Sequence, residues 1–224
     1  MIAREHLATA HAPDGQELRL YAHDRDFMIL LERAELMSTR MRGSEEQLAV
    51  QTIARLGDRV PPRLLIGGYG LGFTLRAALG ALRPDARVTV AEVVPEIIQW
   101  ARGPMAALTD RCLDDPRLEL WIGDVAERIA AVTAGWDAIL LDVDNGPDGL
   151  VRAANDRLYS AAGLAIAKRS LRPGGILAIW SAAPDAGFNR RLRAAGFAVE
   201  EASISARPNG KGPRHVIWFA RRPA

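Results

Sequence analysis

From Arg63 to the end of the chain, short apolar runs alternate with segments that have the periodicity of amphipathic helices. The first runs read RLLIGG, RVTVAEV, LELWIGD, WDAILLDVD and GILAIWSA, and the intervening segments include FTLRAALGAL and PEIIQWARGPMAAL. A further segment, LYSAAGLAIAKRSL from Leu158, reads as a helix that Pro173-Gly174-Gly175 stops. Nearly continuous apolar runs at this spacing are typical of parallel strands that helices cover on both faces. The alternation therefore predicts an α/β fold with one open, Rossmann-like parallel sheet.

The two ends of the chain depart from this alternation. FAVEEASISA and RHVIWFARR read as two strands around a loop rich in Gly and Pro, and we expect them to close the sheet as an antiparallel pair. Residues 1–43 contain strand-like segments separated by turn signals such as PDG, and DFMILLERAELMS reads as one further strand. A helix is expected to follow, with Ser44 as its N-cap. We predict a small N-terminal β appendage over residues 1–43 and a Rossmann-like domain over residues 44–224.

Composition excludes several classes of protein. The 224 residues are 49% hydrophobic, enough for an ordinary core, but no apolar run reaches the length of about 18 residues that a membrane span needs. The 29 basic residues are interspersed with 27 acidic ones, so we expect neither a nucleic-acid nor a membrane partner. The single Cys112 cannot form an intramolecular disulfide, and the four histidines lack ligand spacing, so we expect no metal. With no signal-peptide pattern at the start, we expect a cytoplasmic location.

A glycine-rich loop follows the first of the predicted parallel strands. Gly67, Gly68, Gly70 and Gly72 surround Tyr69, and a helix follows. Glycines allow a sharp turn and let a ligand touch the main chain, although a tight turn without a ligand is the alternative interpretation. The spacing fits the dinucleotide motif only in part, and no Lys-Ser/Thr pair follows, so neither a nicotinamide-dependent oxidoreductase nor a P-loop is favoured. A nucleoside without phosphates fits better, and the sulfonium nucleoside S-adenosylmethionine is the first candidate.

The next strands carry acidic residues at their carboxyl ends. Glu92 comes 20 residues after Gly72, where a carboxylate accepts hydrogen bonds from both ribose hydroxyls. Asp124 is placed to accept the adenine amino group, and Asp142 follows the fourth strand; a solvated strand end or a helix cap is the alternative for each. Carboxyl ends of parallel strands share one edge, so one nucleoside site is predicted. Its residues are Gly67, Gly68, Tyr69, Gly70, Gly72, Glu92, Val93, Gly123, Asp124 and Val125.

Five blocks of the sequence resemble successive blocks of the spermidine synthase family over about residues 63–185. They read RLLIGGYGLGFTLRAAL, VTVAEVVPEIIQWA, PRLELWIGDVAERI, WDAILLDVDNGP and RSLRPGGILAIWSAAP. The resemblance implies aminopropyl transfer from decarboxylated S-adenosylmethionine to a diamine, without a metal and usually by a homodimer. It also implies the seven-stranded S-adenosylmethionine-dependent methyltransferase fold with a small N-terminal β appendage, in agreement with the predicted antiparallel ending of the sheet.

The resemblance also assigns roles to individual residues. Asp142 falls on the family's catalytic aspartate, and a carboxylate there can take the proton of the attacking amine and hold the amine in line. Glu92 would hold the ribose and Asp124 the adenine. The acceptor site borders three short stretches of this sequence. Its predicted residues are Glu45, Glu46, Asp144, Asn145 and Tyr159.

Three departures from the family put its substrates in doubt. Gly70 stands where the family has an aspartate that recognises the donor's ammonium group, Asn145 stands where it has a second acceptor-binding acid, and a tyrosine is absent near Gly43. Each lost charge-assisted hydrogen bond costs about 1.5–3 kcal/mol. Loss of the first carboxylate also removes repulsion toward the carboxylate of intact S-adenosylmethionine, so a switch of donor is one hypothesis. Methyl transfer to a non-polyamine acceptor and a non-catalytic cofactor-binding homologue stay open as alternatives.

Two aromatic residues have open interpretations. Tyr69 either lies over the donor or shields the start of the following helix. Trp180, near the end of a predicted strand, either flanks the site or belongs to the core.

Overall fold

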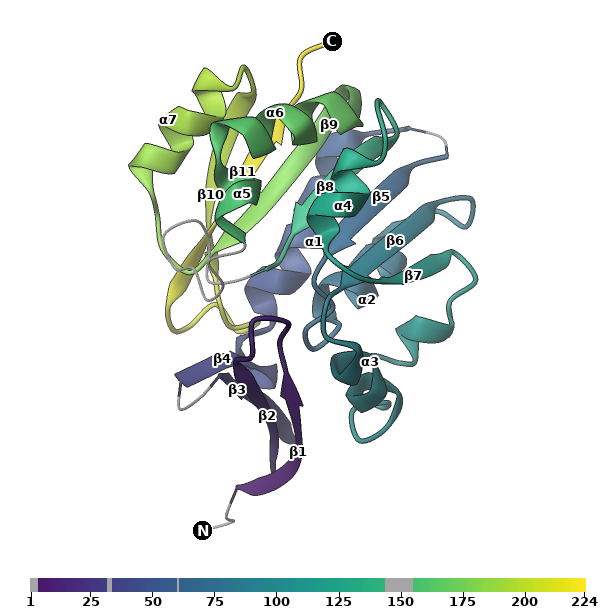
Figure 1. Ribbon diagram of the computed structural model, residues 1–224, viewed down its shortest axis with the longest axis vertical. Helices are drawn as coiled ribbons and strands as arrows, with labels where there is room; N and C mark the ends of the chain where they lie inside the picture. The colour runs from purple at the N-terminus through teal and green to yellow at the C-terminus, as the bar shows by residue number, and fades with distance from the viewer. Residues whose placement is uncertain (1–3, 32–33, 60, 144–154) are drawn as a thin grey trace.

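A seven-stranded sheet forms the centre of the molecule (Figure 1). The structure is a computed structural model, and it describes residues 4–31, 34–59, 61–143 and 155–224. The sheet has the order β10-β11-β9-β8-β5-β6-β7. Neighbours from β9 to β7 are parallel, whereas β11 is antiparallel to both β9 and β10. The strands are β5 (Arg63–Gly67), β6 (Arg87–Glu92), β7 (Leu118–Ile122), β8 (Trp136–Leu141), β9 (Leu171–Ser181), β10 (Ala198–Ser205) and β11 (Arg214–Arg221).

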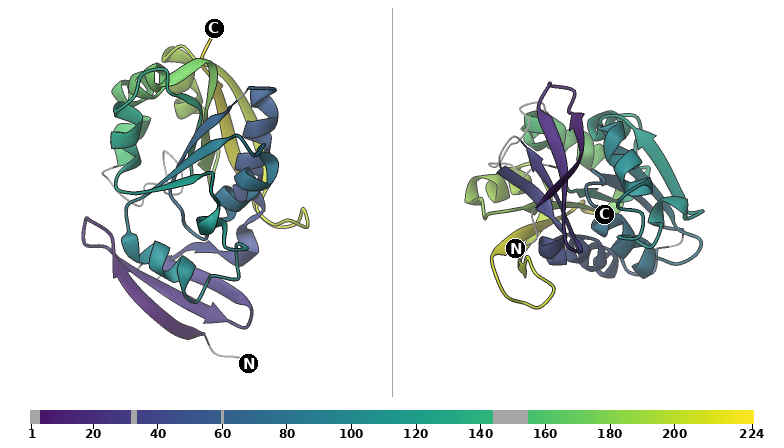
Figure 2. Two further views of the ribbon diagram at one scale, coloured as in Figure 1. Left: turned by 90° about the vertical axis from the view of Figure 1, so that its right-hand side faces the viewer. Right: turned by 90° about the horizontal axis from the view of Figure 1, so that it is seen from below.

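Helices cover both faces of this sheet, which the left view of Figure 2 shows edge-on. Two clusters of buried apolar side chains lie between the helices and the sheet, one on each face. The central β8 is buried along its whole length, as an apolar strand between two helical layers must be. On one face lie α1 (Gly43–Leu56), α2 (Phe73–Ala81) and α3 (Pro95–Arg102), and on the other α4 (Val125–Ala130), α5 (Asp156–Tyr159), α6 (Ala161–Ser170) and α7 (Ala186–Ala194).

A second, four-stranded antiparallel sheet precedes the helices and lies below the large sheet in Figure 1. Its outer hairpin pairs Ala10 with Leu18 around the PDG turn, and Ala10, Leu18 and Leu20 join the core on one face. The sheet faces the carboxyl ends of the parallel strands and so closes one side of any site there. Its strands are β1 (Glu5–His11), β2 (Glu17–His23), β3 (Asp26–Leu31) and β4 (Ala34–Ser38), followed by the 3-10 turn η1 (Thr39–Met41).

The predicted fold class is confirmed, but three local predictions are wrong. The segment from Asp26 to Ser38 holds two strands that pair with each other, not one. Ser44 is not an N-cap, because α1 begins one residue earlier and the Ser44 hydroxyl bonds to side chains of the large sheet instead. The helix predicted from Leu158 onward is divided at Ser160, whose side chain caps a new helix by accepting from Gly163 N. The boundary predicted between residues 43 and 44 stays a prediction.

Two further helix ends differ from the sequence-based expectation. The helix that begins at Pro95 ends at Arg102 rather than near Leu108, with Gly103 as its C-cap. The segment Pro173-Gly174-Gly175, expected to stop a helix, lies inside β9 because α6 already ends at Ser170. Neither difference moves the carboxyl end of a strand, so the edge that carries the predicted site is unaffected.

Candidate active site

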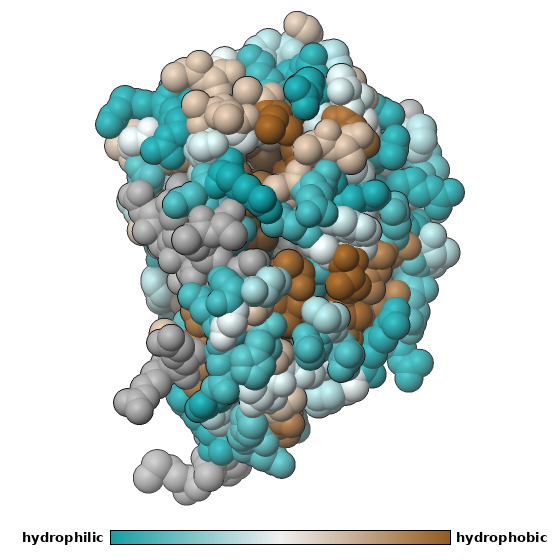
Figure 3. Space-filling model, in the orientation of Figure 1, coloured by the Kyte–Doolittle hydropathy of each residue, from teal (hydrophilic) through white to brown (hydrophobic). Residues whose placement is uncertain are grey.

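A cavity lies where the N-terminal sheet meets the carboxyl ends of the parallel strands. The large sheet contributes residues that follow β5, β6, β7 and β8, and α1 contributes Glu45 from its first turn. On the face shown in Figure 3, hydrophobic side chains gather between α4 and α3. The predicted residues that line the cavity are Glu45, Gly68, Gly70, Glu92, Val93, Gly123, Asp124, Val125 and Asp142.

The glycine-rich loop passes close to two neighbouring groups, which explains two of its glycines. Gly68 has a φ of +84°, and a Cβ at this position would meet the main-chain oxygen of Asp142 at 2.6 Å. Gly70 has a φ of +56°, and a Cβ there would meet Met37 Sδ, from the N-terminal sheet, at 3.1 Å. A side chain at either position is therefore disfavoured by both backbone conformation and contact. The bare backbone of this loop forms one wall of the cavity.

Glu92 holds the glycine loop and the start of α3 together. It is 4% exposed, Oε2 accepts a hydrogen bond from Tyr69 N at 2.9 Å, and Oε1 accepts one from Val94 N at 2.8 Å. Burial raises the pKa of Glu92, while hydrogen bonds from main-chain N–H groups, first that of Val94, offset part of the rise. A carboxylate oxygen can accept more than one hydrogen bond, so a ligand hydroxyl can share these oxygens with the main-chain N–H groups.

Asp124 lies two residues after the end of β7 and is the N-cap of α4. Its Oδ1 accepts a hydrogen bond from Ala126 N at 2.8 Å, and its Oδ2 forms an ion pair with Arg157. An adenine amino group would thus share Oδ2 with the guanidinium of Arg157. Gly123 beside it packs against the ring of Trp121, which would collide with a Cβ at 2.6 Å.

Asp142 and Glu45 form a pair of carboxyl groups at the opposite end of the cavity. Thr74 Oγ1 lies 2.7 Å from Asp142 Oδ2 and 3.3 Å from the main-chain oxygen of Glu45, so one hydroxyl connects the two residues. Burial raises the pKa of Asp142 from 3.8 to about 6, and the hydrogen bond from Thr74 limits that rise. Burial, and next the charge of Asp142, raises the pKa of Glu45 well above its ordinary value. Both shifts favour the protonated forms, so the pair carries less negative charge near neutral pH than two separate carboxylates would.

Several predicted residues do not line the cavity. Gly67 and Gly72 lie in β5 and at the N-cap of α2, outside the lining set. The ring of Tyr69 is buried, with its hydroxyl 3.3 Å from Thr109 Oγ1 and 3.7 Å from Cys112 Sγ, so it shields the start of α2 rather than covering a donor. Burial raises the pKa of Tyr69. Its contribution to the site is its main-chain N–H.

Two predicted acceptor residues are also engaged elsewhere. Glu46 forms an ion pair with Arg76 and lies 3.4 Å from Arg42 Nε, away from the cavity lining. Tyr159 is buried, and its hydroxyl donates to the main-chain oxygen of Val143 at 3.1 Å. Asp144 and Asn145 lie outside the described residues, so their predicted roles are neither supported nor opposed.

The structure adds residues that sequence patterns did not single out. The N-terminal sheet brings Gln16 and Met37 to the cavity, and Asn155 reaches it from the start of α5. Gln16 Oε1 is buried and has no hydrogen-bond partner among the described residues. A buried amide oxygen without a partner costs about 1–3 kcal/mol, which a ligand hydroxyl or ammonium group in the cavity can recover. The sequence around Gln16 does not indicate a role in ligand binding, because only the packing of the two sheets brings this residue to the site.

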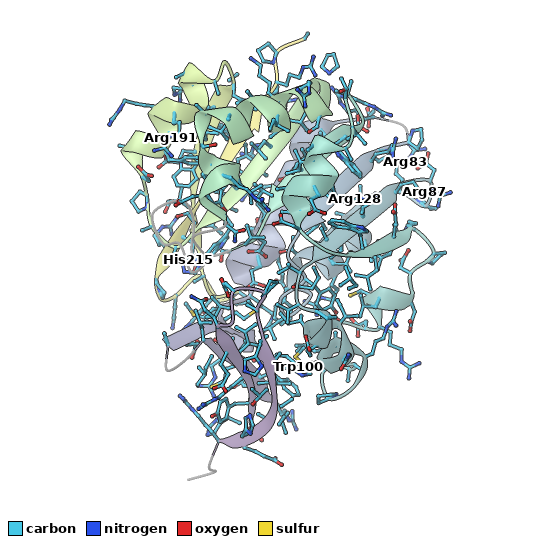
Figure 4. The ribbon with its side chains drawn as sticks, viewed as in Figure 1. Arg83, Arg87, Trp100, Arg128, Arg191 and His215 are labelled. Carbon is cyan, nitrogen blue, oxygen red and sulfur yellow. The ribbon has the colours of Figure 1, made fainter. Side chains whose placement is uncertain are left out.

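The charge of the lining is one-sided. Among the described residues that line the cavity there are four carboxyl groups, those of Glu45, Glu92, Asp124 and Asp142, and no Lys, Arg or His, although Arg157 pairs with Asp124 from outside the lining. Figure 4 shows Arg83, Arg87 and Arg191 at the periphery of the molecule, away from this edge of the sheet. The described residues contain no group of three metal-ligating side chains, and none of their helices combines the length and apolarity of a membrane span. The cavity therefore suits a cationic ligand with an apolar body.

Comparisons with known proteins agree with this geometry. A family model described as S-adenosyl-L-methionine-dependent methyltransferase matches residues 95–209. Polyamine aminopropyltransferase 2 of Streptomyces coelicolor is 31% identical over 188 residues, and the polyamine aminopropyltransferase of Mycobacterium tuberculosis is 35% identical over 145. These matches cover 79% and 61% of this chain but 33% and 27% of the relatives, so the chain spans at most about a third of their length.

A solved structure confirms the fold. The spermidine synthase from Thermotoga maritima has a TM-score of 0.77 at 21% sequence identity, with 97% of this chain and 72% of that chain covered. The resemblance to the spermidine synthase family that the five sequence blocks predicted is thereby confirmed, as is the seven-stranded fold with an N-terminal β appendage.

Proposed function

The chain belongs to the S-adenosyl-L-methionine-dependent methyltransferase family, and from this membership we propose that it transfers an alkyl group from a sulfonium nucleoside to a small amine. The donor is S-adenosylmethionine or its decarboxylated form. The observation that carries the proposal is the one-sided charge of the cavity, with four carboxyl groups and no basic side chain among its described lining residues. Both substrates of such a reaction, a sulfonium and an ammonium, are cations.

The nucleoside end of the cavity supports the donor. Glu92 presents a carboxylate beside the bare backbone of Gly68 and Gly70, where a ribose can approach without meeting a side chain. Val93 and Val125 offer apolar contacts for a base, with Asp124 at the rim. The donor supplies a carbon activated by positive sulfur, which leaves as a neutral thioether.

The carboxyl pair supports the amine acceptor and the chemistry. Asp142, with its pKa near 6, is mostly ionised at neutral pH and can accept the proton of an ammonium group. The freed amine nitrogen then forms a bond to the carbon next to sulfur as the carbon–sulfur bond breaks, and the proton stays on Asp142. Thr74 fixes the carboxylate by its hydrogen bond, which aligns the base with the nucleophile. The reaction needs no metal.

Which alkyl group moves depends on the donor's tail. The polyamine aminopropyltransferases among the relatives favour an aminopropyl group and hence the decarboxylated donor. Gly70 and its neighbour Met37 favour the alternative. Gly70 stands where the family has an aspartate, and the thioether of Met37 beside it offers an ammonium group no carboxylate. Methyl transfer from intact S-adenosylmethionine is therefore the second candidate function. A homodimer and a cytoplasmic location stay predictions.

The first test is calorimetric binding of both donors to the same purified protein, with Glu92→Gln as the matched variant. We expect one donor to bind and the variant to lose about tenfold or more in affinity, because an amide cannot accept from both main-chain N–H groups and the ribose. Preference for the decarboxylated donor supports aminopropyl transfer, and preference for the intact donor supports methyl transfer. Binding of neither donor would contradict the proposed function.

A further inference from the structure

Trp180 borders the carboxyl pair at the end of β9. Leu141 of β8 pairs with Ile179 of β9, so Asp142 and Trp180 are the next residues of two adjacent parallel strands. Glu45 approaches the same corner from the first turn of α1. All three side chains line the cavity, and we call Glu45, Asp142 and Trp180 the acceptor corner. The corner combines a negative charge with an indole ring.

Two buried residues hold the indole in place. Trp180 Nε1 donates a hydrogen bond to Ser44 Oγ at 3.0 Å, and Ser44 Oγ lies 2.8 Å from His215 Nδ1. The rings of Trp180 and His215 meet edge to face with their centroids 4.7 Å apart. Ser44 is fully buried and directly precedes Glu45, so one turn of chain positions both the carboxyl group and the indole. Figure 4 shows His215 on the side of the domain toward the N-terminal sheet.

This arrangement limits what the indole can offer a ligand. Its N–H is already used by Ser44, so the cavity meets only ring carbons and the π-system. The Ser44 hydroxyl accepts from Trp180 and keeps its own proton, which it can donate to His215 Nδ1 when the imidazole is neutral. Burial lowers the pKa of His215, in agreement with that state. A π-system beside a carboxylate attracts an alkylammonium ion and its methylene groups together.

We propose that Trp180 selects the acceptor, which is a cationic alkylamine. The ammonium group of this amine lies against Asp142 and Glu45, and its alkyl chain lies on the indole. Ser44 and His215 position the indole. The inference rests on the proposed function, because it names the class of acceptor for that site. It adds an aromatic recognition element for which the resemblance in sequence provided no role.

The test compares a cation with a neutral molecule of the same size. n-Butylamine and n-butanol are titrated by NMR into the protein, with and without bound 5′-methylthioadenosine. In Trp180→Leu we expect butylamine to bind about tenfold more weakly and butanol to change by less than about twofold, since leucine keeps an apolar wall but has no π-system. Trp180→Phe should keep most of the preference for the amine. Equal losses for both probes, or no loss for either, would overturn the proposal.

Variants of the two positioning residues test the rest of the inference. Ser44→Ala removes the anchor and should lower the ratio of amine to alcohol affinity as Trp180→Leu does, whereas His215→Asn can still accept from Ser44 and should preserve the ratio. An unchanged ratio in Ser44→Ala would overturn the positioning role. Trp136→Phe is the matched control, because Trp136 is buried at the other end of β8 and its Nε1 has no hydrogen-bond partner among the described residues.

The same samples separate the two proposals. Binding of 5′-methylthioadenosine is measured in each variant and should be unchanged in Trp180→Leu. If wild-type protein binds no nucleoside, the proposed function fails. The amine-to-alcohol ratio in nucleoside-free protein still decides whether Trp180 recognises an ammonium ion.

Discussion

Thr74 donates a hydrogen bond to Asp142, with Oγ1 2.7 Å from Oδ2, and this hydroxyl lies in the buried first turn of α2. Thr74 thereby links the helix that follows the glycine loop to the carboxylate that follows β8. The bond favours the charged form of Asp142, whereas burial favours the neutral form and is the stronger effect, since the pKa is raised to about 6. The state of the proposed base is set by the balance of these two effects.

Removal of this hydrogen bond should move the titration of Asp142 upward. Thr74→Val keeps the shape of the side chain but donates nothing to the carboxylate, so we expect the pKa of Asp142 to rise by about one unit. NMR titration of the Asp142 carboxyl carbon measures this without a known acceptor. Thr74→Ser, which keeps the hydroxyl, is the control and should leave the titration near its original midpoint. An unchanged midpoint in Thr74→Val would show that the bond does not tune this group.

Neutralisation of Asp142 should stabilise the protein while removing its activity. The folded-state pKa is above the ordinary value of 3.8, so the stability this group contributes is present below pH about 4 and is lost as the pH rises through about 6. Asp142→Asn cannot ionise, and we expect its free energy of unfolding at pH 7 to exceed that of the original protein by about 1–3 kcal/mol. Urea unfolding at pH 7 and pH 4 checks this, because the difference should shrink at pH 4.

The same variant also tests the chemistry of the proposal. Loss of the base should lower the rate of alkyl transfer at least about a hundredfold once an acceptor is found. A variant that is more stable and still fully active would exclude Asp142 as the base, whereas a variant that is less stable would show that the carboxylate is paired in the native state.

Gly70 offers a direct test of donor choice. A Cβ at this position would meet Met37 Sδ at 3.1 Å, so Gly70→Asp is best combined with Met37→Ala. We expect the double variant to shift the ratio of affinities toward the decarboxylated donor by about tenfold, because a carboxylate attracts the aminopropyl ammonium group and repels the carboxylate of the intact donor. Gly70→Asn with Met37→Ala has the same shape without the charge and should leave the ratio unchanged. If both double variants gave the same ratio of donor affinities, residue 70 would have no part in recognising the donor's tail.

Gln16 should behave as a residue kept for ligand binding. Gln16→Met removes the buried Oε1 that has no partner among the described residues, so we expect the ligand-free protein to gain about 1 kcal/mol in unfolding free energy. Binding of the donor should weaken in the same variant, because a partner for a hydroxyl or ammonium group is lost. Chemical unfolding and calorimetry measure the two effects. A variant that is destabilised, or that binds the donor as well as before, would contradict this role.

The sequence by itself determined the parallel sheet and the residues at its carboxyl edge, because both depend only on neighbouring residues along each strand and its loop. The apolar runs of β5, β6 and β8 require a covered parallel sheet, since such strands cannot face water on either side. The glycines at 68 and 70 follow one strand and the acid at 92 ends the next, and the carboxyl ends of these strands must meet at one edge. For this reason, Glu92, Gly123, Asp124 and Asp142 were predicted together, and all four line one cavity.

Tertiary structure decided which of those residues face the cavity and what completes it. The local sequence does not indicate the direction of the Tyr69 and Tyr159 rings. In the folded protein the hydroxyl of Tyr69 contacts Cys112 and that of Tyr159 contacts Val143, so neither ring lines the cavity. Gln16, Met37 and Trp180 are far from Asp142 in the sequence, and only the docking of the N-terminal sheet and the pairing of β9 with β8 bring them to it. The physical reason is that a strand specifies its own faces by its alternation, whereas contacts between separate elements depend on the side chains of both. The proposed class of ligand was thus readable from one edge of a sheet, while the proposed acceptor corner exists only in the folded protein.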